Sequence, residues 1–355
     1  MLSLIKEMNS QLRTLAMPIS GRLFVNQIWL AMVLISVGYK PDIILGTSGG
    51  CITGVLLLLC GVNSVRDRAS YCIFKKKVWE ILALLDSKWY LSEWSSNLLV
   101  SRVIGMQQGS LFDRGYGESL INDIEVDLNC QPEMWIGTRD RTQAKHQLFC
   151  TRSRASSTLK MNGAIYANGD VQLITKASIA SCAVPTIVPG IRIGESIYCD
   201  GGLTHASPLG PCASAYQERS SSSSQEESHP YHVVYISPAR YNNKDDPCTQ
   251  EIEDDDVWNQ LASSTAGITG RSLHIPDRNN GIRMVGPNPK KTVGQGKCAL
   301  QRALQTQECS ERSFIEITPC DPVHLNFITM KRGEAVVALE SVYGSDEFTV
   351  RHWYI

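Results

Sequence analysis

Residues Asp42–Cys51 read DIILGTSGGC, and this stretch decides which fold the chain is expected to adopt. Ile43, Ile44 and Leu45 form a short apolar run that is typical of a strand buried on both faces. The glycines that follow favour a tight turn, and the apolar run from Ile52 to Cys60 predicts a helix. A strand, a tight turn and a helix in this order predict an α/β fold.

The turn itself has the pattern Gly-x-Ser-x-Gly, with Ser48 between Gly46 and Gly50. In a nucleophile elbow, the serine sits on a sharp strand-to-helix turn that exposes its hydroxyl, and the next backbone N–H helps to stabilise an oxyanion. Glycines are needed there because the backbone is strained and side chains would clash. Ser48 is therefore a candidate nucleophile, and a purely structural glycine-rich turn is the alternative.

The flanking sequence continues the α/β pattern. Residues Leu23–Val37 predict a helix that ends at Gly38, and a short first strand is expected over Leu15–Ile19. The sequence also predicts an amphipathic helix near residues 330–344. Runs rich in β-branched and aromatic residues, bounded by turn residues, predict further strands near 134–140, 146–152, 164–170, 192–202, 231–239 and 313–319.

Composition and charge narrow the functional classes. Lys and Arg total 34 against 35 for Asp and Glu, so the net charge of −1 gives no electrostatic reason to expect nucleic-acid binding. The twelve cysteines are scattered and form no C-x-x-C pair, so we expect free thiols in a reducing compartment, with no metal and no cofactor. We expect no secretion signal at the start of the chain, because an acidic residue and polar residues interrupt it, and the apolar segments are shorter than the roughly 20 residues that span a bilayer, so a cytoplasmic location is expected.

A nucleophilic serine must be activated by a base. None of the seven histidines follows a strand in the Ser, Asp, His order of the usual hydrolases, and His324 and His205 are only weak candidates. Asp200 follows the apolar run Ile-Tyr-Cys and precedes Gly201 and Gly202, at a turn where the backbone can approach another element closely. An ordinary Asp-Gly turn accounts for this pattern equally well.

Two longer stretches resemble the patatin-like phospholipase family. Residues 38–61, GYKPDIILGTSGGCITGVLLLLCG, are similar to its nucleophile region, and residues 178–210, SIASCAVPTIVPGIRIGESIYCDGGLTHASPLG, are similar to its catalytic aspartate region. The second stretch has an Ala/Ser-rich turn, Pro185, Pro189, a strand, Asp-Gly-Gly and Pro208 in the family's order. Weaker likeness continues through YHVVYISPA and SFIEITPCDP to residues 335–343. The resemblance implies a three-layer αβα fold with a mostly parallel central sheet.

The resemblance also implies a Ser–Asp dyad that hydrolyses acyl esters without a catalytic histidine. Ser48 would be the nucleophile, and Asp200 the general base that accepts its proton and later activates water. Because a carboxylate of ordinary pKa is a weak base, the site must hold Asp200 close to Ser48 and largely out of water. A single patatin-like domain is expected over residues 12–343, interrupted by a polar loop at 217–230 and an irregular insert at 241–311, with a C-terminal tail at 344–355.

One part of the family pattern is altered in this sequence. The family has a loop Gly-Gly-Gly-x-Arg/Lys-Gly whose N–H groups form the oxyanion hole, whereas residues Met17–Phe24 read MPISGRLF. Proline has no N–H, and the loss of one oxyanion donor typically costs about 10²–10³ in rate. The donors expected here are Gly21, Arg22 and Gly49, and the glycines expected to shape the two turns are Gly46, Gly50, Gly201 and Gly202.

Three functions remain open on the sequence alone. The first is a lipid acyl hydrolase of the phospholipase A or esterase type, acting in lipid metabolism through an acyl-Ser48 intermediate with Asp200 as general base. Its partner would be a lipid or phospholipid ester, with peripheral contact to intracellular membranes. The second is a catalytically weak or inactive patatin-like domain that binds lipid or protein, and the altered loop favours it. The third is a Ser-His-Asp esterase that uses His324 or His205.

Overall fold

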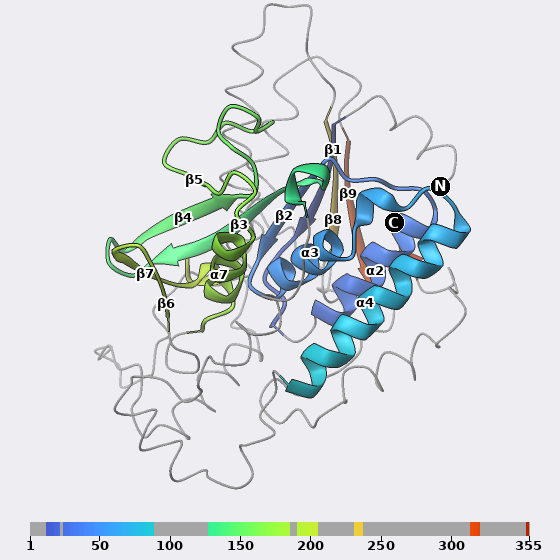
Figure 1. Cartoon of the computed structure of the whole chain (residues 1–355), viewed down its shortest axis with the longest axis horizontal. Helices are drawn as coiled ribbons and strands as arrows, with labels where there is room; N and C mark the ends of the chain where they lie inside the picture. Colours follow the sequence, from blue (N-terminus) through green and yellow to red (C-terminus); the bar gives the residue numbers. More distant parts are fainter. Residues whose placement is uncertain are drawn as a thin grey trace, which may run out of the picture.

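The computed structural model describes residues 12–21, 24–88, 127–184, 190–204, 231–236, 313–319 and 353–354. In this part of the chain, helices flank a ten-stranded sheet in a mixed α/β fold (Figure 1). The predicted α/β class with a mostly parallel central sheet is confirmed. The expected helix near 330–344, the loop at 217–230, the insert at 241–311 and nearly all of the tail lie outside the described residues.

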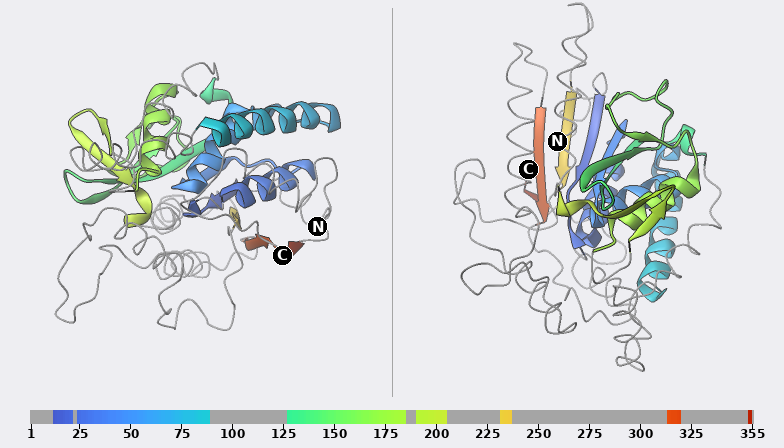
Figure 2. Two further views of the ribbon diagram at one scale, coloured as in Figure 1. Left: turned by 90° about the horizontal axis from the view of Figure 1, so that it is seen from below. Right: turned by 90° about the vertical axis from the view of Figure 1, so that its left-hand side faces the viewer.

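Five parallel strands form the centre of the sheet. Figure 2 shows three of them, β1, β8 and β9, side by side, although β1 is far from the other two in the sequence. The order across the centre is β9 (Ser313–Pro319), β8 (Tyr231–Ile236), β1 (Leu12–Met17), β2 (Ile43–Thr47) and β3 (Glu133–Asp140).

Antiparallel pairing begins at both sides of this parallel centre. The short β10 (Trp353–Tyr354) pairs with β9, and β3 has two antiparallel neighbours. These neighbours are β4 (Lys145–Cys150), which pairs in parallel with β5 (Ile165–Tyr166), and β7 (Ser196–Asp200), which forms a hairpin with β6 (Ile191–Ile193).

The helices pack on the sheet according to their apolar pattern. Every residue of α2 (Phe24–Ser36) except Ser36 is buried, so this helix lies inside the fold. In α4 (Arg68–Lys88) the buried residues Tyr71, Phe74 and Val78 recur every three or four positions, which is the spacing of one helix face. The other helices are α3 (Gly49–Leu59), α7 (Val171–Ser181) and the single turns η3 (Val62–Ser64), η4 (Leu128–Cys130) and η5 (Gly201–Leu203).

Alternation along β2 divides the core between the two faces of the sheet. Ile44 belongs to the cluster that includes buried residues of all four long helices, whereas Ile43 and Leu45 belong to a second cluster around Trp135. Successive side chains of a strand point to opposite faces, so burial of both faces requires the continuous apolar run that the sequence contains.

Several elements differ from the sequence prediction: the strand expected over 192–202 is the hairpin of β6 and β7, and the strand expected over 164–170 is the two-residue β5. The first strand was expected over Leu15–Ile19, but β1 runs from Leu12 to Met17. It ends before Pro18 because proline has no N–H to donate to a strand ladder. The helix expected from Ile52 begins at Gly49, directly after Ser48, as an elbow requires.

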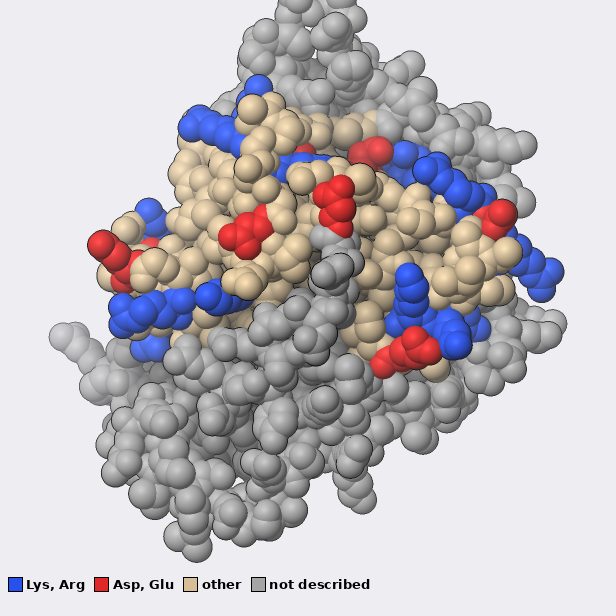
Figure 3. Space-filling view, viewed as in Figure 1, with Lys and Arg blue, Asp and Glu red and all other residues tan. Residues whose placement is uncertain are grey.

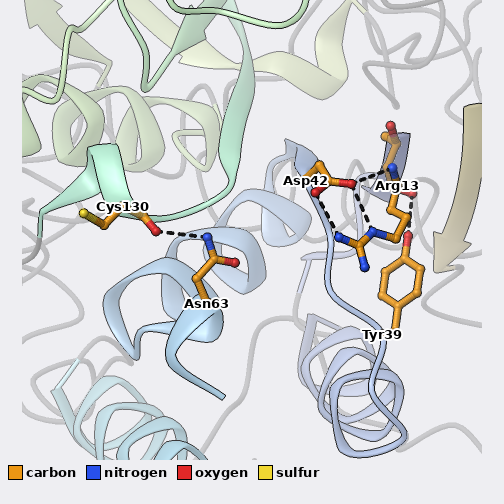
Figure 4. Close-up of polar contacts among 6 residues, drawn as sticks. Arg13, Tyr39, Asp42, Asn63 and Cys130 are labelled. Carbon is orange, nitrogen blue, oxygen red and sulfur yellow. Dashed lines mark hydrogen bonds and ion pairs between the residues drawn. The ribbon is translucent and has the colours of Figure 1, made fainter. Parts of the chain in front are cut away.

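Polar contacts fix the ends of β1, β2 and β3 that lie away from the Ser48 turn (Figure 4). The Arg13 guanidinium donates to both carboxylate oxygens of Asp42 at 3.0 Å, which joins β1 to the residue before β2. Tyr39 donates its hydroxyl to the Thr14 carbonyl oxygen, and the Asn63 amide donates to the Cys130 carbonyl oxygen just before β3. These contacts hold the amino-terminal ends of the three parallel strands together, and their carboxyl ends lie at the opposite end of the sheet.

Candidate active site

Strand β3 brings the two candidate catalytic turns together. Its residue Gly137 pairs with Thr47, the last residue of β2, and the next residue, Thr138, pairs with Asp200, the last residue of β7. Strand β2 is parallel to β3, and β7 is antiparallel to β3. The carboxyl ends of β2 and β7 therefore meet head to head beside β3. Ser48 therefore follows β2 at the point where Asp200 ends β7.

Ser48 has the strained backbone of an elbow. Its φ of 53° and ψ of −127° are unusual for a residue with a side chain, and such conformations cost about 1–3 kcal/mol unless the surroundings enforce them. A serine before a helix commonly caps it through its hydroxyl, but the Ser48 side chain makes no cap bond to α3. Its Oγ instead donates to Asp200 Oδ2 at 2.8 Å.

The two oxygens of the Asp200 carboxylate have separate partners. Oδ2 accepts from Ser48, and Oδ1 accepts from the Gly202 backbone N–H at 2.7 Å. The Asp200 backbone N–H donates to the Ala183 carbonyl oxygen at 3.0 Å, which ties the end of β7 to the residues after α7. Because the hydroxyl and the carboxylate are in direct contact, no imidazole lies between them as it would in a Ser-His-Asp triad.

Burial changes the acidity of Asp200. The side chains of Ser48 and Asp200 belong to residues that are only 5% and 2% exposed, so the carboxylate is removed from water. Desolvation raises the pKa of Asp200 to about 7, although hydrogen bonds from Gly202 and Ser48 oppose the rise. A carboxylate with a pKa near neutrality is a much stronger base than an ordinary aspartate, and it can accept a proton from a hydroxyl.

The end of α7 holds the Ser48 peptide from both sides. The Ser48 N–H donates to Ser181 Oγ at 2.8 Å, and Ser181 Oγ donates to the Gly137 carbonyl oxygen at 2.6 Å. The Cys182 thiol lies 3.1 Å from the Ser48 carbonyl oxygen and donates to it. Sequence reasoning treated this region as an Ala/Ser-rich turn, and nothing in the residue pattern connected Ser181 with a serine 133 positions earlier.

Glycines allow the turns to approach one another closely. A Cβ at Gly201 would lie 2.2 Å from the Gly137 carbonyl oxygen, and one at Gly46 would lie 2.8 Å from the Cys51 Cα. A Cβ at Gly50 would lie 2.3 Å from the Met17 carbonyl oxygen. Each of these contacts is with backbone atoms, so a larger residue cannot be accommodated by a side-chain rotation. The sequence-based assignment of these glycines to the turns is therefore consistent with their surroundings.

Among the predicted oxyanion residues, Gly21 and Gly49 lie next to each other. A Cβ at Gly49 would stand 2.4 Å from the Gly21 carbonyl oxygen and 3.1 Å from its nitrogen, and Gly21 has a left-handed φ of 50°. Arg22 lies outside the described residues, as do His205, His324, Pro185, Pro189 and Pro208. The structure thus brings together Ser48, Asp200, Gly21 and Gly49.

Comparison with known proteins shows the family of the chain. The family model described as patatin-like phospholipase matches residues 24–213, which is more than half of the chain and includes both Ser48 and Asp200. The chain belongs to the patatin-like phospholipase family. The match to the patatin-like model begins after Gly21, so it does not include the altered loop.

Similarity of this patatin-like chain to individual proteins is low. Among solved structures, VipD from Legionella pneumophila has a TM-score of 0.29 and 9% sequence identity. That comparison covers 83% of this chain and 66% of VipD, so this chain spans slightly less than two thirds of VipD. No curated protein matches the sequence.

The face of the molecule drawn in Figure 3 carries charges of both signs, with Lys, Arg, Asp and Glu side chains scattered over its described surface. None of the described helices is long and apolar enough to cross a membrane. Within the described ranges there is also no group of three or more His, Cys, Asp or Glu side chains that could hold a metal ion.

The described cysteines are free. Cys51, Cys60, Cys150 and Cys199 are buried, Cys182 is partly buried, and Cys72 and Cys130 are exposed. Cys51, Cys182 and Cys199 interact with the Asp200 charge, and desolvation by burial raises the pKa of each thiol. The three thiols are therefore neutral near pH 7, whereas the Asp200 carboxylate titrates there.

Proposed function

We propose that this chain is a lipid acyl hydrolase that cleaves carboxylic esters through an acyl-Ser48 intermediate, with Asp200 as general base. The observation that carries the proposal is the 2.8 Å hydrogen bond from the Ser48 hydroxyl to a desolvated carboxylate, made by a serine with strained elbow geometry. Membership of the patatin-like family, which acts on lipid substrates, supports the substrate class.

The proposed reaction has two steps. In the first, Ser48 Oγ attacks the ester carbonyl carbon while its proton passes to Asp200 Oδ2, and collapse of the tetrahedral intermediate expels an alcohol that takes the proton from Asp200. In the second, Asp200 accepts a proton from water, whose oxygen attacks the acyl carbon. Collapse of this second intermediate releases the carboxylic acid, and the proton returns to Ser48 Oγ.

A fluorophosphonate probe and short p-nitrophenyl esters test the proposal directly. Wild-type protein should become labelled at Ser48 and release p-nitrophenol, whereas Ser48→Ala should do neither. Ser178→Ala is a matched control because Ser178 is a buried serine whose hydroxyl donates to the Ile174 carbonyl oxygen in its own helix and hydrogen-bonds the Cys51 thiol, and within the described part of the chain it makes no hydrogen bond to Ser48 or Asp200. Labelling at another residue, or turnover that survives Ser48→Ala, would contradict the proposed nucleophile.

The altered loop favours a second candidate function, a catalytically weak patatin-like domain that binds lipid. Pro18 has no N–H, and the loop backbone atom closest to a Cβ placed at Gly49 is the Gly21 carbonyl oxygen, which cannot stabilise an oxyanion. If this candidate is correct, phospholipid vesicles should bind wild type, Ser48→Ala and Asp200→Asn equally, without turnover. A cytoplasmic location and reversible contact with membranes are further parts of the proposal.

A further inference from the structure

The segment that replaces the family's glycine-rich loop contacts both catalytic turns. The Met17 and Pro18 carbonyl oxygens pack against Gly50, and the Ile19 side chain packs against Gly202, where a Cβ would meet its Cδ1 at 2.3 Å. Pro18 is held in place because its carbonyl oxygen accepts from Gln27 Nε2 at 3.1 Å, and the same amide group donates to the Ile236 carbonyl oxygen. Residues 17–21 therefore cross the site between the elbow and the Asp200 turn.

Ser20 lies in the middle of this crossing. Its Oγ would stand 2.4 Å from a Cβ at Gly49, which is the residue after the nucleophile. This hydroxyl is buried, and within the described part of the chain it has no hydrogen-bond partner. Burial of an unpaired hydroxyl costs free energy, commonly about 1–3 kcal/mol, so such a group calls for an explanation.

The chemistry of its neighbours identifies what Ser20 could bind. Gly49 provides the backbone N–H that follows the nucleophile, and this N–H is one of the first in helix α3, which have no partner inside the helix. The Gly21 carbonyl oxygen beside it can only accept. A serine hydroxyl can rotate to donate, so Ser20 can add a side-chain donor to the backbone N–H groups of Gly49 and Gly21.

We propose that the Ser20 hydroxyl is a catalytic oxyanion donor that replaces a backbone N–H of the altered glycine-rich loop. It pairs with the negatively charged oxygen that forms when Ser48 attacks the ester, and among the described residues it has no partner before that oxygen forms. The inference rests on the proposed hydrolase function. It supplies an oxyanion donor in a loop where Pro18 has no N–H.

The test compares Ser20→Ala with Ser20→Cys and with the control Ser178→Ala. For p-nitrophenyl butyrate, Ser20→Ala should lower kcat by about 10²–10³ with little change in KM, because the missing donor acts only on the transition state. Ser20→Cys, with a weaker donor of similar shape, should lie between Ser20→Ala and wild type. Affinity for an alkyl trifluoromethyl ketone, which forms a tetrahedral oxyanion on Ser48, should fall by a similar factor in Ser20→Ala.

A thermal melt separates catalysis from folding. Because the Ser20 hydroxyl makes no hydrogen bond to any of the residues that the structure describes, Ser20→Ala should unfold at the same temperature as wild type or slightly higher. Ser48-dependent turnover with wild-type kcat and ketone affinity in Ser20→Ala would overturn this inference alone. A loss of activity that only follows a lowered melting temperature, with Ser20→Cys equal to Ser20→Ala, would also overturn it. No Ser48-dependent turnover in wild type would overturn the proposed function as well.

Discussion

The pH dependence of Ser48 labelling is expected to follow the ionisation of Asp200. Asp200 must be a carboxylate to accept the Ser48 proton, and desolvation raises its pKa from 3.8 to about 7. With a pKa of about 7, roughly one tenth of the carboxylate is ionised at pH 6 and roughly one hundredth at pH 5. An aspartate of ordinary pKa would remain more than about nine-tenths ionised at pH 5.

The assay is the pseudo-first-order rate of fluorophosphonate labelling between pH 5 and 9, read by mass spectrometry of the Ser48 peptide. The rate should fall about tenfold per pH unit below 7 and level off above 8. Asp200→Asn should label slowly and without this step, because the amide cannot accept the proton. Wild-type labelling that stays constant down to pH 5, or has its midpoint near pH 4, would refute the claim that burial makes Asp200 an effective base.

The raised pKa of Asp200 makes labelling faster as the pH rises, but it makes the folded protein less stable. A carboxylate whose folded pKa is raised above its unfolded value favours the folded state most below pH 4, and this contribution is lost as the pH rises through about 7. The loss amounts to at most about 4 kcal/mol at 1.36 kcal/mol per pKa unit. Asp200→Asn should therefore resist urea better than wild type at pH 8, and the difference should vanish near pH 4. Equal urea midpoints at both pH values would argue against a desolvated carboxylate.

Three further predictions follow from contacts around the site. Ser181→Ala should slow Ser48 labelling about tenfold or more, because it removes the acceptor of the Ser48 N–H, whereas the control Ser178→Ala should label at the wild-type rate. Equal labelling rates in the two variants would show that the conformation of Ser48 does not depend on Ser181. Gly201→Ala should lower the free energy of unfolding by about 1–3 kcal/mol, since its Cβ would overlap a backbone carbonyl of β3, and an unchanged urea midpoint would contradict that close approach. Iodoacetamide mapping should find exposed Cys72 modified in the folded protein and buried Cys51 protected, and rapid modification of Cys51 would show that the core at α3 opens.

Much of the fold could be predicted from the sequence because local patterns determine it. The apolar run at Ile43–Leu45, the glycines around Ser48 and the apolar helix that follows are all close in the chain, and the structure has the α/β class that they predicted. The end of β1 was placed two residues too late, although Pro18 marks the point where a strand ladder must stop. The helix α7 was missed because its C-terminal part, Ser178–Ser181, was interpreted as part of an Ala/Ser-rich turn.

The sequence by itself determined that this chain has an elbow serine, an aspartate at an Asp-Gly-Gly turn and an altered oxyanion loop. It predicted Ser48 and Asp200 as partners only through resemblance to a family, since no local rule relates residues 152 positions apart. Tertiary structure decided their contact, because β3 pairs Gly137 with Thr47 and the adjacent Thr138 with Asp200. It also decided the pKa of Asp200 and the places of Ser181 and Ser20, since burial and hydrogen-bond partners depend on segments that only folding brings together.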